Sequence, residues 1–181
     1  MSDSSGGSPA PVDPREPRRR LLVMRHAKAA EPDDTPDHER PLAPRGRRDA
    51  PEVGAWLASL APDGWVPTVV LCSDAVRTRQ TTELLVAALV AAGGPAPQVT
   101  GSGALYQAGV HQVLDEIAQV PEDVATLLVV GHEPTMSATV ALLTGQRLRF
   151  PTAGVARVEL AGGWSSCGAD AGSLLDLRTP S

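Results

Sequence analysis

The chain has 181 residues and a formal net charge of −5, and 42% of its residues are hydrophobic. This length is enough to bury a substantial core, and the negative charge argues against general nucleic-acid binding. The two cysteines, Cys72 and Cys167, are too few to suggest a disulfide framework. Since no apolar stretch is long enough to span a bilayer, we expect a cytoplasmic protein with no membrane partner.

Residues 1–18 are rich in Ser, Gly, Pro and Asp, and this composition predicts a disordered N-terminal tail. The arginines at positions 18–20 stand before an apolar run, as in a twin-arginine export signal. That run is far too short for such a signal and ends in charged residues. We therefore expect residues 19–181 to form a single domain.

Downstream of the tail, apolar runs of strand length alternate with stretches of helical periodicity. The expected strands are 21–25, 67–72, 97–100, 125–130, 155–160 and 173–177, and the expected helices are 44–60, 75–92, 109–119 and 134–144. This alternation predicts an α/β fold, a three-layer sandwich whose mostly parallel central sheet is covered by helices on both faces. The last two strands follow each other without a helix, so one pairing there should be antiparallel.

The first expected strand ends at Arg25 and His26. Ligand sites in open α/β sheets lie beyond the carboxyl ends of the strands, so this pair stands where chemistry is usually done. Taken alone, an Arg-His pair could simply cap a strand. Two further stretches repeat the pattern and favour a functional interpretation.

The second and third of these stretches also pass from an apolar strand into a polar turn and then a helix. In the second, Ser73 or Asp74 is the expected N-cap of a helix whose first turn contains or adjoins Arg77. In the third, the strand ends at His132, and Pro134 suits the first position of the next helix. The amino ends of these two helices add N–H donors and positive dipole ends.

Four side chains should therefore converge on one crevice: Arg25, His26, Arg77 and His132. Two guanidinium groups and two imidazoles describe a pocket for a dianion, and a phosphoryl group fits best.

These motifs resemble those of the histidine phosphatase superfamily. The resemblance is carried by Arg25-His26, by residues 73–81 and by Gly131-His132, and it extends from about Leu21 to near the C-terminus. Residues 40–46 and 150–154 are similar to those of the small bacterial SixA-type phosphohistidine phosphatases.

Two positions depart from the family pattern. Ala27 stands where the family usually has glycine, which should be tolerated unless the backbone needs a positive φ. Ala43 stands where the family often has threonine, which removes a hydroxyl cap but leaves Pro44 to start the helix. Neither change affects an expected catalytic side chain.

The resemblance implies that His26 is a nucleophile that forms a phosphohistidine intermediate, which water then hydrolyses. A neutral imidazole is competent for this near pH 7. Arg25 and Arg77 would clamp the equatorial phosphoryl oxygens, and His132 would donate a further hydrogen bond. No cofactor or metal is expected, because no cluster of residues has the spacing of a metal site.

A general acid is missing from the expected place. Larger relatives use a glutamate in the region where this chain has Tyr106 and Gln107. The carboxylates nearest to the motifs in sequence, each better explained as a solvated loop charge, are Glu31, Asp33, Asp34 and Glu133. Imidazole leaving a phosphohistidine is far more stable than an alkoxide, so a dedicated acid is less necessary for that substrate.

Several alternatives remain open. A cysteine-dependent phosphatase would need five residues between Cys72 and Arg77, and here there are four. A phosphoglycerate-mutase-like enzyme would be longer and would carry the acid. A non-catalytic phosphate-binding module would not need His26. Among substrates, protein phosphohistidine is favoured, with a small phosphorylated metabolite as the alternative, and we expect a monomer.

Overall fold

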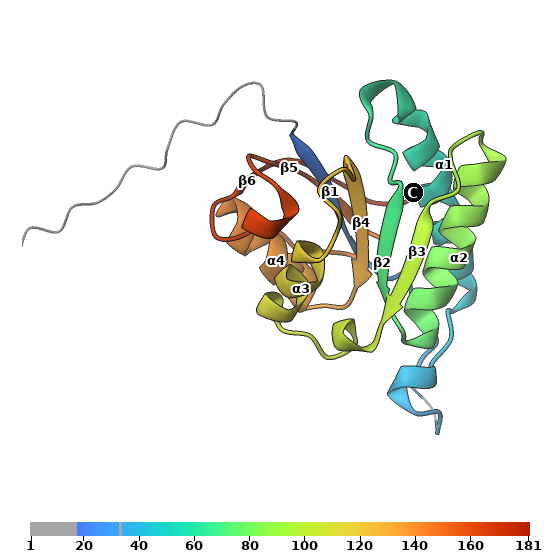
Figure 1. Ribbon diagram of the computed structural model, residues 1–181. Coiled ribbons are helices and arrows are strands. Elements are labelled where there is room, and N and C mark those ends of the chain that lie inside the picture. Colours follow the sequence, from blue (N-terminus) through green and yellow to red (C-terminus); the bar gives the residue numbers. More distant parts are fainter. Residues whose placement is uncertain (1–17, 33) are drawn as a thin grey trace, which may run out of the picture.

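The computed structural model describes residues 18–32 and 34–181. A six-stranded sheet with the order β3-β2-β4-β1-β5-β6 lies between two layers of helices, as Figure 1 shows. The strands are β1 (Arg19–Arg25), β2 (Val69–Ser73), β3 (Gln98–Ser102), β4 (Thr126–Gly131), β5 (Val155–Leu160) and β6 (Gly172–Arg178). The helices are α1 (Pro44–Ser59), α2 (Val76–Ala91), α3 (Val110–Ala118) and α4 (Thr135–Thr144). The predicted α/β fold class is confirmed, and residues 1–17 of the predicted tail lie outside the described part of the chain.

The sheet is mostly parallel, with three parallel pairings: β1 with β4, β2 with β3, and β2 with β4. The expected antiparallel pairing of β5 with β6 is present. A second antiparallel pairing joins β5 to β1, where Met24 lies opposite Val155. The sequence pattern did not predict it. The segment after α4 returns to the carboxyl edge of the sheet before β5 begins, so β5 must run against β1.

Each central strand is buried on both faces. In β1, Leu21 and Val23 pack into the core beneath α3 and α4, whereas Leu22 and Met24 pack into the core beneath α1 and α2, and all four are at most 1% exposed. Because successive strand residues point to opposite faces, a strand covered on both sides reads as a continuous apolar run. All six strands were predicted to within two residues at either end, and this burial accounts for the buried strands β1, β2, β4 and β5 but not for the exposed edge strands β3 and β6.

Three neighbouring parallel strands end at the same edge of the sheet, the lower edge in Figure 1. Arg25 at the end of β1 pairs with Gly131 at the end of β4, and β2 ends beside them at Ser73. The residues that follow these ends carry the expected site. The order of the strands therefore brings together motifs that are far apart in the sequence.

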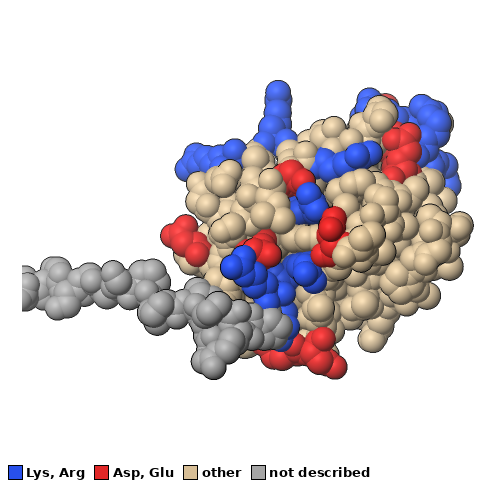
Figure 2. Space-filling view, turned by 90° about the horizontal axis from the view of Figure 1, so that it is seen from above, with Lys and Arg blue, Asp and Glu red and all other residues tan. Residues whose placement is uncertain are grey.

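Figure 2 looks onto the opposite edge, where basic and acidic side chains lie next to one another. Arg18 forms an ion pair with Glu159, and Arg157 pairs with Asp176 in the neighbouring part of the sheet. Two arginines of this part of the molecule, Arg18 and Arg157, are thus neutralised by carboxylates. Within the described residues, no helix has both the length and the apolar character needed to cross a membrane.

Three helices, α2, α3 and α4, begin one residue later than predicted, and two predictions about their caps differ from the structure. Ala75 is the N-cap of α2, and Ser73 is the last residue of β2, so the predicted side-chain cap from Ser73 or Asp74 is wrong. The side chain of Ser73 hydrogen-bonds His132 instead. Pro134 is the N-cap of α4, one residue before the predicted position. Pro44 begins α1 as expected.

Candidate active site

His26 lies directly after β1 and is 9% exposed. Its backbone N–H donates to the carbonyl of Gly131 (2.9 Å), and its carbonyl accepts from Ala153 (3.1 Å). The ring Nδ1 lies 2.7 Å from the carbonyl oxygen of Ala27. Because a carbonyl can only accept, Nδ1 must carry the proton, and the lone pair is on Nε2. The local backbone therefore sets both the position and the tautomer of this imidazole.

The pKa of His26 is lowered from 6.5 to about 3, chiefly by burial and in smaller part by the nearby His132, Arg77 and Arg25, whereas the hydrogen bond to the Ala27 carbonyl opposes the shift. The imidazole is consequently neutral at physiological pH. A neutral ring with a free electron pair on Nε2 is the nucleophilic form.

Arg77 occupies the first turn of α2 and is 7% exposed. The hydroxyl of Thr81 donates to the carbonyl of Arg77 (2.7 Å) and accepts from the N–H of Ala27 (3.1 Å). This threonine joins the helix to the loop that carries His26. Arg25, at the end of β1, donates from Nη1 to the carbonyl of Phe150 (2.9 Å).

Ala27, at the family's glycine position, is fully buried. In the described chain, the non-glycine residues with positive φ are Ala153 and Asp170, and Ala27 is not among them. Its methyl group therefore causes no backbone strain of the kind that would require glycine.

His132 follows β4, and its ring centroid lies 5.1 Å from that of His26. Its Nδ1 is 3.3 Å from Nη2 of Arg77, and its Nε2 is 2.8 Å from Oγ of Ser73. A guanidinium can only donate, so Nδ1 accepts and Nε2–H donates to the serine. Burial, followed by the charge of Arg77, lowers the pKa of His132 to about 4. The ring is neutral in this arrangement, and both of its nitrogens are engaged.

A cavity of about 190 Å³ opens beside these groups. It is lined by Arg25, His26, Lys28, Ala29, Arg40, Arg77 and Thr152. Three of the four predicted side chains thus line one cavity, and His132 contacts both His26 and Arg77 behind it. The concentration of positive charge in so small a space suits an anion.

Asp37, which the sequence analysis missed, is the carboxylate at this site. It lies in the short helix η1 (Asp37–Glu39), and its Oδ2 accepts from Nη2 of Arg77 (2.9 Å) and from the hydroxyl of Tyr106 (2.8 Å). Its main-chain carbonyl accepts from Nη1 of Arg77, and its Oδ1 accepts from Arg40 (2.8 Å). The Tyr106 hydrogen bond, followed by those from Arg77 and Arg40, lowers the pKa of Asp37 to about 2 despite opposing desolvation.

One sequence signal could have pointed to Asp37. Asp37 stands three residues before Arg40, which begins the family-like stretch 40–46. It also belongs to the loop that contains the candidate acids Glu31, Asp33 and Asp34. Its contact with Arg77 crosses 40 positions of the chain, and no local pattern reveals such a contact.

The predicted acids have other partners. Glu31 forms an exposed ion pair with Lys28 (3.0 Å), and Glu133 accepts from Oγ of Ser137 (2.6 Å) at the start of α4. Asp34 is exposed, and Asp33 lies outside the described residues. The contacts of Glu31 and Glu133 are therefore not with the expected catalytic groups.

Beside Arg77 and His132, on the side of Asp37, stand aromatic rings that are not themselves part of the cavity lining. The ring of Tyr106 stands edge-on to His132 (centroids 5.6 Å apart, 78°) and to His38 (4.7 Å, 89°). The guanidinium carbon of Arg77 lies 5.9 Å from the Tyr106 ring centroid. His38 is itself paired with Asp74, with Nε2 3.0 Å from Oδ1. A layer of three rings thus runs outward from the buried groups.

The cysteine alternative has no support in the geometry. Cys72 is buried in the core beneath α1 and α2, and burial raises the pKa of its thiol. A thiol with a raised pKa is a poor source of thiolate. His26 and Arg77 line a cavity of which Cys72 is not a part.

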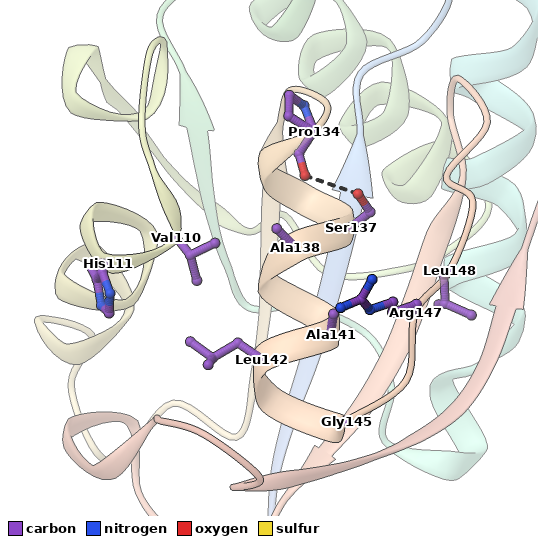
Figure 3. Close-up of a pocket in the computed structure, with 10 residues that line it drawn as sticks. All are labelled: Val110, His111, Pro134, Ser137, Ala138, Ala141, Leu142, Gly145, Arg147 and Leu148. Atoms are coloured by element: carbon purple, nitrogen blue, oxygen red, sulfur yellow. Dashed lines mark hydrogen bonds between the residues drawn. The ribbon is translucent and has the colours of Figure 1, made fainter.

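A larger groove, of about 730 Å³, lies between α3 and α4 (Figure 3). Its lining is mainly apolar, with Val110, Leu142 and Leu148 among its walls, and His111 and Arg147 are the lining residues that can carry charge. The single hydrogen bond drawn there joins Ser137 to the carbonyl of Pro134 (2.9 Å). This groove lacks the convergent cationic groups of the smaller cavity. Over the described residues, no cluster of three or more His, Cys, Asp or Glu side chains is arranged to hold a metal ion.

Comparisons with known proteins agree on one family. Residues 21–93 match the family model of the histidine phosphatase superfamily (branch 1). Uncharacterized protein Rv1276c of Mycobacterium tuberculosis (strain ATCC 25618 / H37Rv) is 40% identical over 168 residues, which cover 87% of this chain and 99% of that protein.

Solved structures are similar over nearly the whole chain. A structure from Nakamurella multipartitia that bears the name phosphohistidine phosphatase SixA is 33% identical, with a TM-score of 0.77 and coverage of 90% of this chain and 96% of that one. The protein histidine phosphatase SixA in complex with tungstate is 27% identical, with a TM-score of 0.73 and coverage of 89% and 97%.

Proposed function

The chain belongs to the SixA-type branch of the histidine phosphatase superfamily and is a phosphatase, and we propose that His26 is its nucleophile and protein phosphohistidine its substrate. The feature that supports this most strongly is the buried neutral imidazole of His26. Its Nδ1 is engaged by Ala27, and the three guanidinium groups of Arg25, Arg40 and Arg77 line the same cavity. The alternative, a phosphate-binding module without catalytic activity, would not need a buried nucleophilic imidazole at this position.

Phosphoryl binding is the first step. Arg25 and Arg77 hold the equatorial oxygens, because planar guanidinium groups match phosphoryl geometry with two donors. The carboxylate and carbonyl of Asp37 accept hydrogen bonds from Arg77. The phosphoryl dianion therefore competes with Asp37 for this guanidinium.

In the second step, Nε2 of His26 donates its electron pair to phosphorus while the bond to the leaving group breaks. The transition state is loose, so positioning and charge stabilisation supply most of the catalysis. Water then attacks the phosphohistidine, phosphate departs, and His26 recovers its electron pair.

His132 takes part through a change of protonation. The charge of Arg77 helps to lower the pKa of His132, and a bound dianion opposes that effect. Once protonated on Nδ1, the ring donates to a phosphoryl oxygen while Nε2–H remains on Ser73. Ser73 thus orients a donor that forms when substrate binds.

The leaving group favours phosphohistidine. Residues 106 and 107 carry no carboxylate, and general acid assistance is typically worth ~10²–10⁴-fold. An imidazole leaving group needs little assistance from an acid, whereas an alkoxide leaving group depends on it. The kcat/KM for phosphohistidine or p-nitrophenyl phosphate should exceed that for phosphoserine or 3-phosphoglycerate by roughly this factor. Gln107→Glu should raise alkyl phosphatase activity and leave phosphohistidine turnover little changed.

The decisive experiment is to trap the intermediate. Rapid quenching without acid, followed by mass spectrometry, should find an acid-labile and alkali-stable phosphate on His26. His26→Ala should abolish both the label and turnover, and Cys72→Ala, which alters a buried thiol, should retain both. Full activity in EDTA is expected, since Arg25, Arg77 and His132 already serve the phosphoryl oxygens. Phosphate on Cys72, or substantial activity in His26→Ala, would refute the mechanism.

The physiological substrate needs a separate measurement. Phosphoproteomic comparison of a deletion strain with its parent should show accumulation of phosphohistidine on particular proteins. Accumulation of a small phosphorylated metabolite with unchanged phosphohistidine would favour the alternative, a small-molecule phosphomonoesterase.

A further inference from the structure

We infer that Tyr106 and His38 form a subsite that selects leaving groups with a planar ring. This inference rests on the proposed function, because it assigns the direction in which the leaving group departs from His26. The two residues do not belong to the phosphoryl clamp. The substrates that they would favour all carry a flat ring bonded to the phosphoryl group.

The direction of departure follows from in-line transfer. His26 is buried at the end of β1, with Arg77 and His132 beside it. A leaving group opposite Nε2 must project away from this buried end, toward the more exposed residues that border Arg77 and His132. Tyr106 borders both of these, at 5.9 Å from the Arg77 guanidinium and 5.6 Å from the His132 ring.

The Tyr106 ring is held in place before any substrate arrives. Leu105, its neighbour, is 3% exposed and packs into the core beneath α3 and α4. The Tyr106 backbone N–H donates to the carbonyl of Gly103 (3.2 Å), and its hydroxyl donates to Oδ2 of Asp37 (2.8 Å). A ring fixed at both ends loses little conformational entropy when a ligand packs against it.

His38 extends this aromatic surface outward. Its ring stands edge-on to Tyr106 and is fixed by the bond to Asp74, and its side chain is 41% exposed. Together the two rings form an aromatic surface that begins beside Arg77 and His132 and ends at the partly exposed ring of His38. A planar leaving group can pack on this surface edge-to-face or with an offset, which stabilises it beyond the burial of apolar area. A short alkyl chain is stabilised only by the area that it buries.

The subsite agrees with the leaving-group chemistry proposed above. Where a carboxylate could protonate an alkoxide, residue 106 is an aromatic ring. Phenolate and imidazole leave with little acid assistance, and they are also the groups that an aromatic ring binds best. Tyr106 therefore provides no acid for alkyl phosphates and favours substrates whose leaving group is a planar ring.

The test separates the ring of Tyr106 from its hydroxyl. In the wild type, phenylphosphonate should bind more tightly than methylphosphonate, and Tyr106→Leu should reduce that Kd ratio by roughly twofold to tenfold, the range of a single aromatic pair. Tyr106→Phe, which keeps the ring and loses the bond to Asp37, should preserve the ratio. His38→Leu should reduce it by a smaller factor.

A second pair tests the nitrogen-linked ring. The kcat/KM ratio of N-phosphoimidazole to phosphoramidate should fall in Tyr106→Leu and persist in Tyr106→Phe. An unchanged ratio in Tyr106→Leu, in either pair, overturns the subsite. An equal fall in the Phe and Leu variants also overturns it, since the hydroxyl would then be responsible.

Phosphonate binding needs no turnover, so it can be measured by calorimetry even if a variant loses activity. Binding of inorganic phosphate serves as the check that each variant is folded, and His38→Leu provides an independent route if Tyr106→Leu is not. Tyr106→Leu should still form the phosphate adduct on His26. Failure of the ring preference with an intact adduct refutes the subsite alone, whereas absence of the adduct in the wild type refutes the proposed function.

Discussion

The two sides of the catalytic cavity are constructed differently. On the buried side, His26 is held through its backbone by Gly131 and Ala153, and Ser73 orients the ring of His132. On the outer side the contacts are mainly between side chains: Tyr106 donates to Asp37, Asp37 accepts from Arg77 and Arg40, and His38 is paired with Asp74. The buried side is therefore part of the sheet, and the outer side is a layer laid against it.

This difference separates two kinds of role. A group fixed by the backbone of a buried sheet is held rigidly enough to supply a nucleophile and an oxyanion clamp. A group fixed by exposed side chains can vary without disturbing the core and is suited to selecting what approaches. Substitutions on the buried side should affect catalysis or stability, and those on the outer side should affect affinity and preference.

The largest effect should come from Arg77→Lys on the buried side. Lysine cannot supply a planar pair of donors to the phosphoryl oxygens, so kcat/KM should fall by about 10²–10³-fold. Steady-state kinetics measures this. Arg79→Lys, an exposed change on the same helix, is the matched control and should behave like the wild type. If the Arg77→Lys variant kept a kcat/KM close to that of the wild type, the clamp would be contradicted.

Gly46→Ala should come next, through stability. A Cβ at this position would lie 2.2 Å from the carbonyl oxygen of Lys28, two residues after His26, and backbone cannot yield as a flexible side chain can. Overpacking of this kind costs about 1–3 kcal/mol. Urea unfolding should show the loss, accompanied by reduced turnover. Gly101→Ala, where no atom lies within 4 Å, is the control. Equal stability of the two variants would show that the loop adjusts freely.

The pH dependence of stability should reveal the neutral imidazole of His26. Its pKa is lowered from 6.5 to about 3 in the folded state, so on acidification the unfolded state binds protons first. The folded state consequently loses stability as pH falls below 6.5. From pH 7 to pH 5 this one residue should remove about 2 kcal/mol.

Urea unfolding of the wild type and of His26→Gln at both pH values measures this contribution. The wild type should lose about 2 kcal/mol more than the variant, whereas between pH 7 and 8 the two should change alike. Identical losses on acidification would mean that the imidazole of His26 is charged in the folded protein at pH 5.

The smallest effect is expected on the outer side, from Asp37→Asn. Removing this charge frees the guanidinium of Arg77 for a competing anion, so inhibition by inorganic phosphate should strengthen. Asp37 is half-exposed, and exposed ion pairs are worth little, so the Ki should fall by no more than about fivefold. Asp34→Asn, on the same loop, is the control. A weaker inhibition in Asp37→Asn would indicate that Asp37 positions Arg77 for phosphate.

The residues of the buried side were predicted from the sequence, whereas Asp37 on the outer side was missed. Apolar periodicity locates the boundaries of strands and helices. Arg25, His26, Arg77 and His132 were found because each lies at or just after the end of a strand or in the first turn of a helix. The structure brings these four together. Their catalytic roles stay predictions until the phosphorylated residue is trapped.

By itself, the sequence determined the succession of strands and helices, the α/β fold class and the four buried-side residues, because burial and turn chemistry act over a few neighbouring positions. The tertiary structure alone decided the antiparallel pairing of β5 with β1, the partnership of Ser73 with His132, and the contact of Asp37 with Arg77 and Tyr106. It also decided the lowered pKa of His26. These properties depend on which distant groups become neighbours, and desolvation and charge act through space without regard to sequence separation.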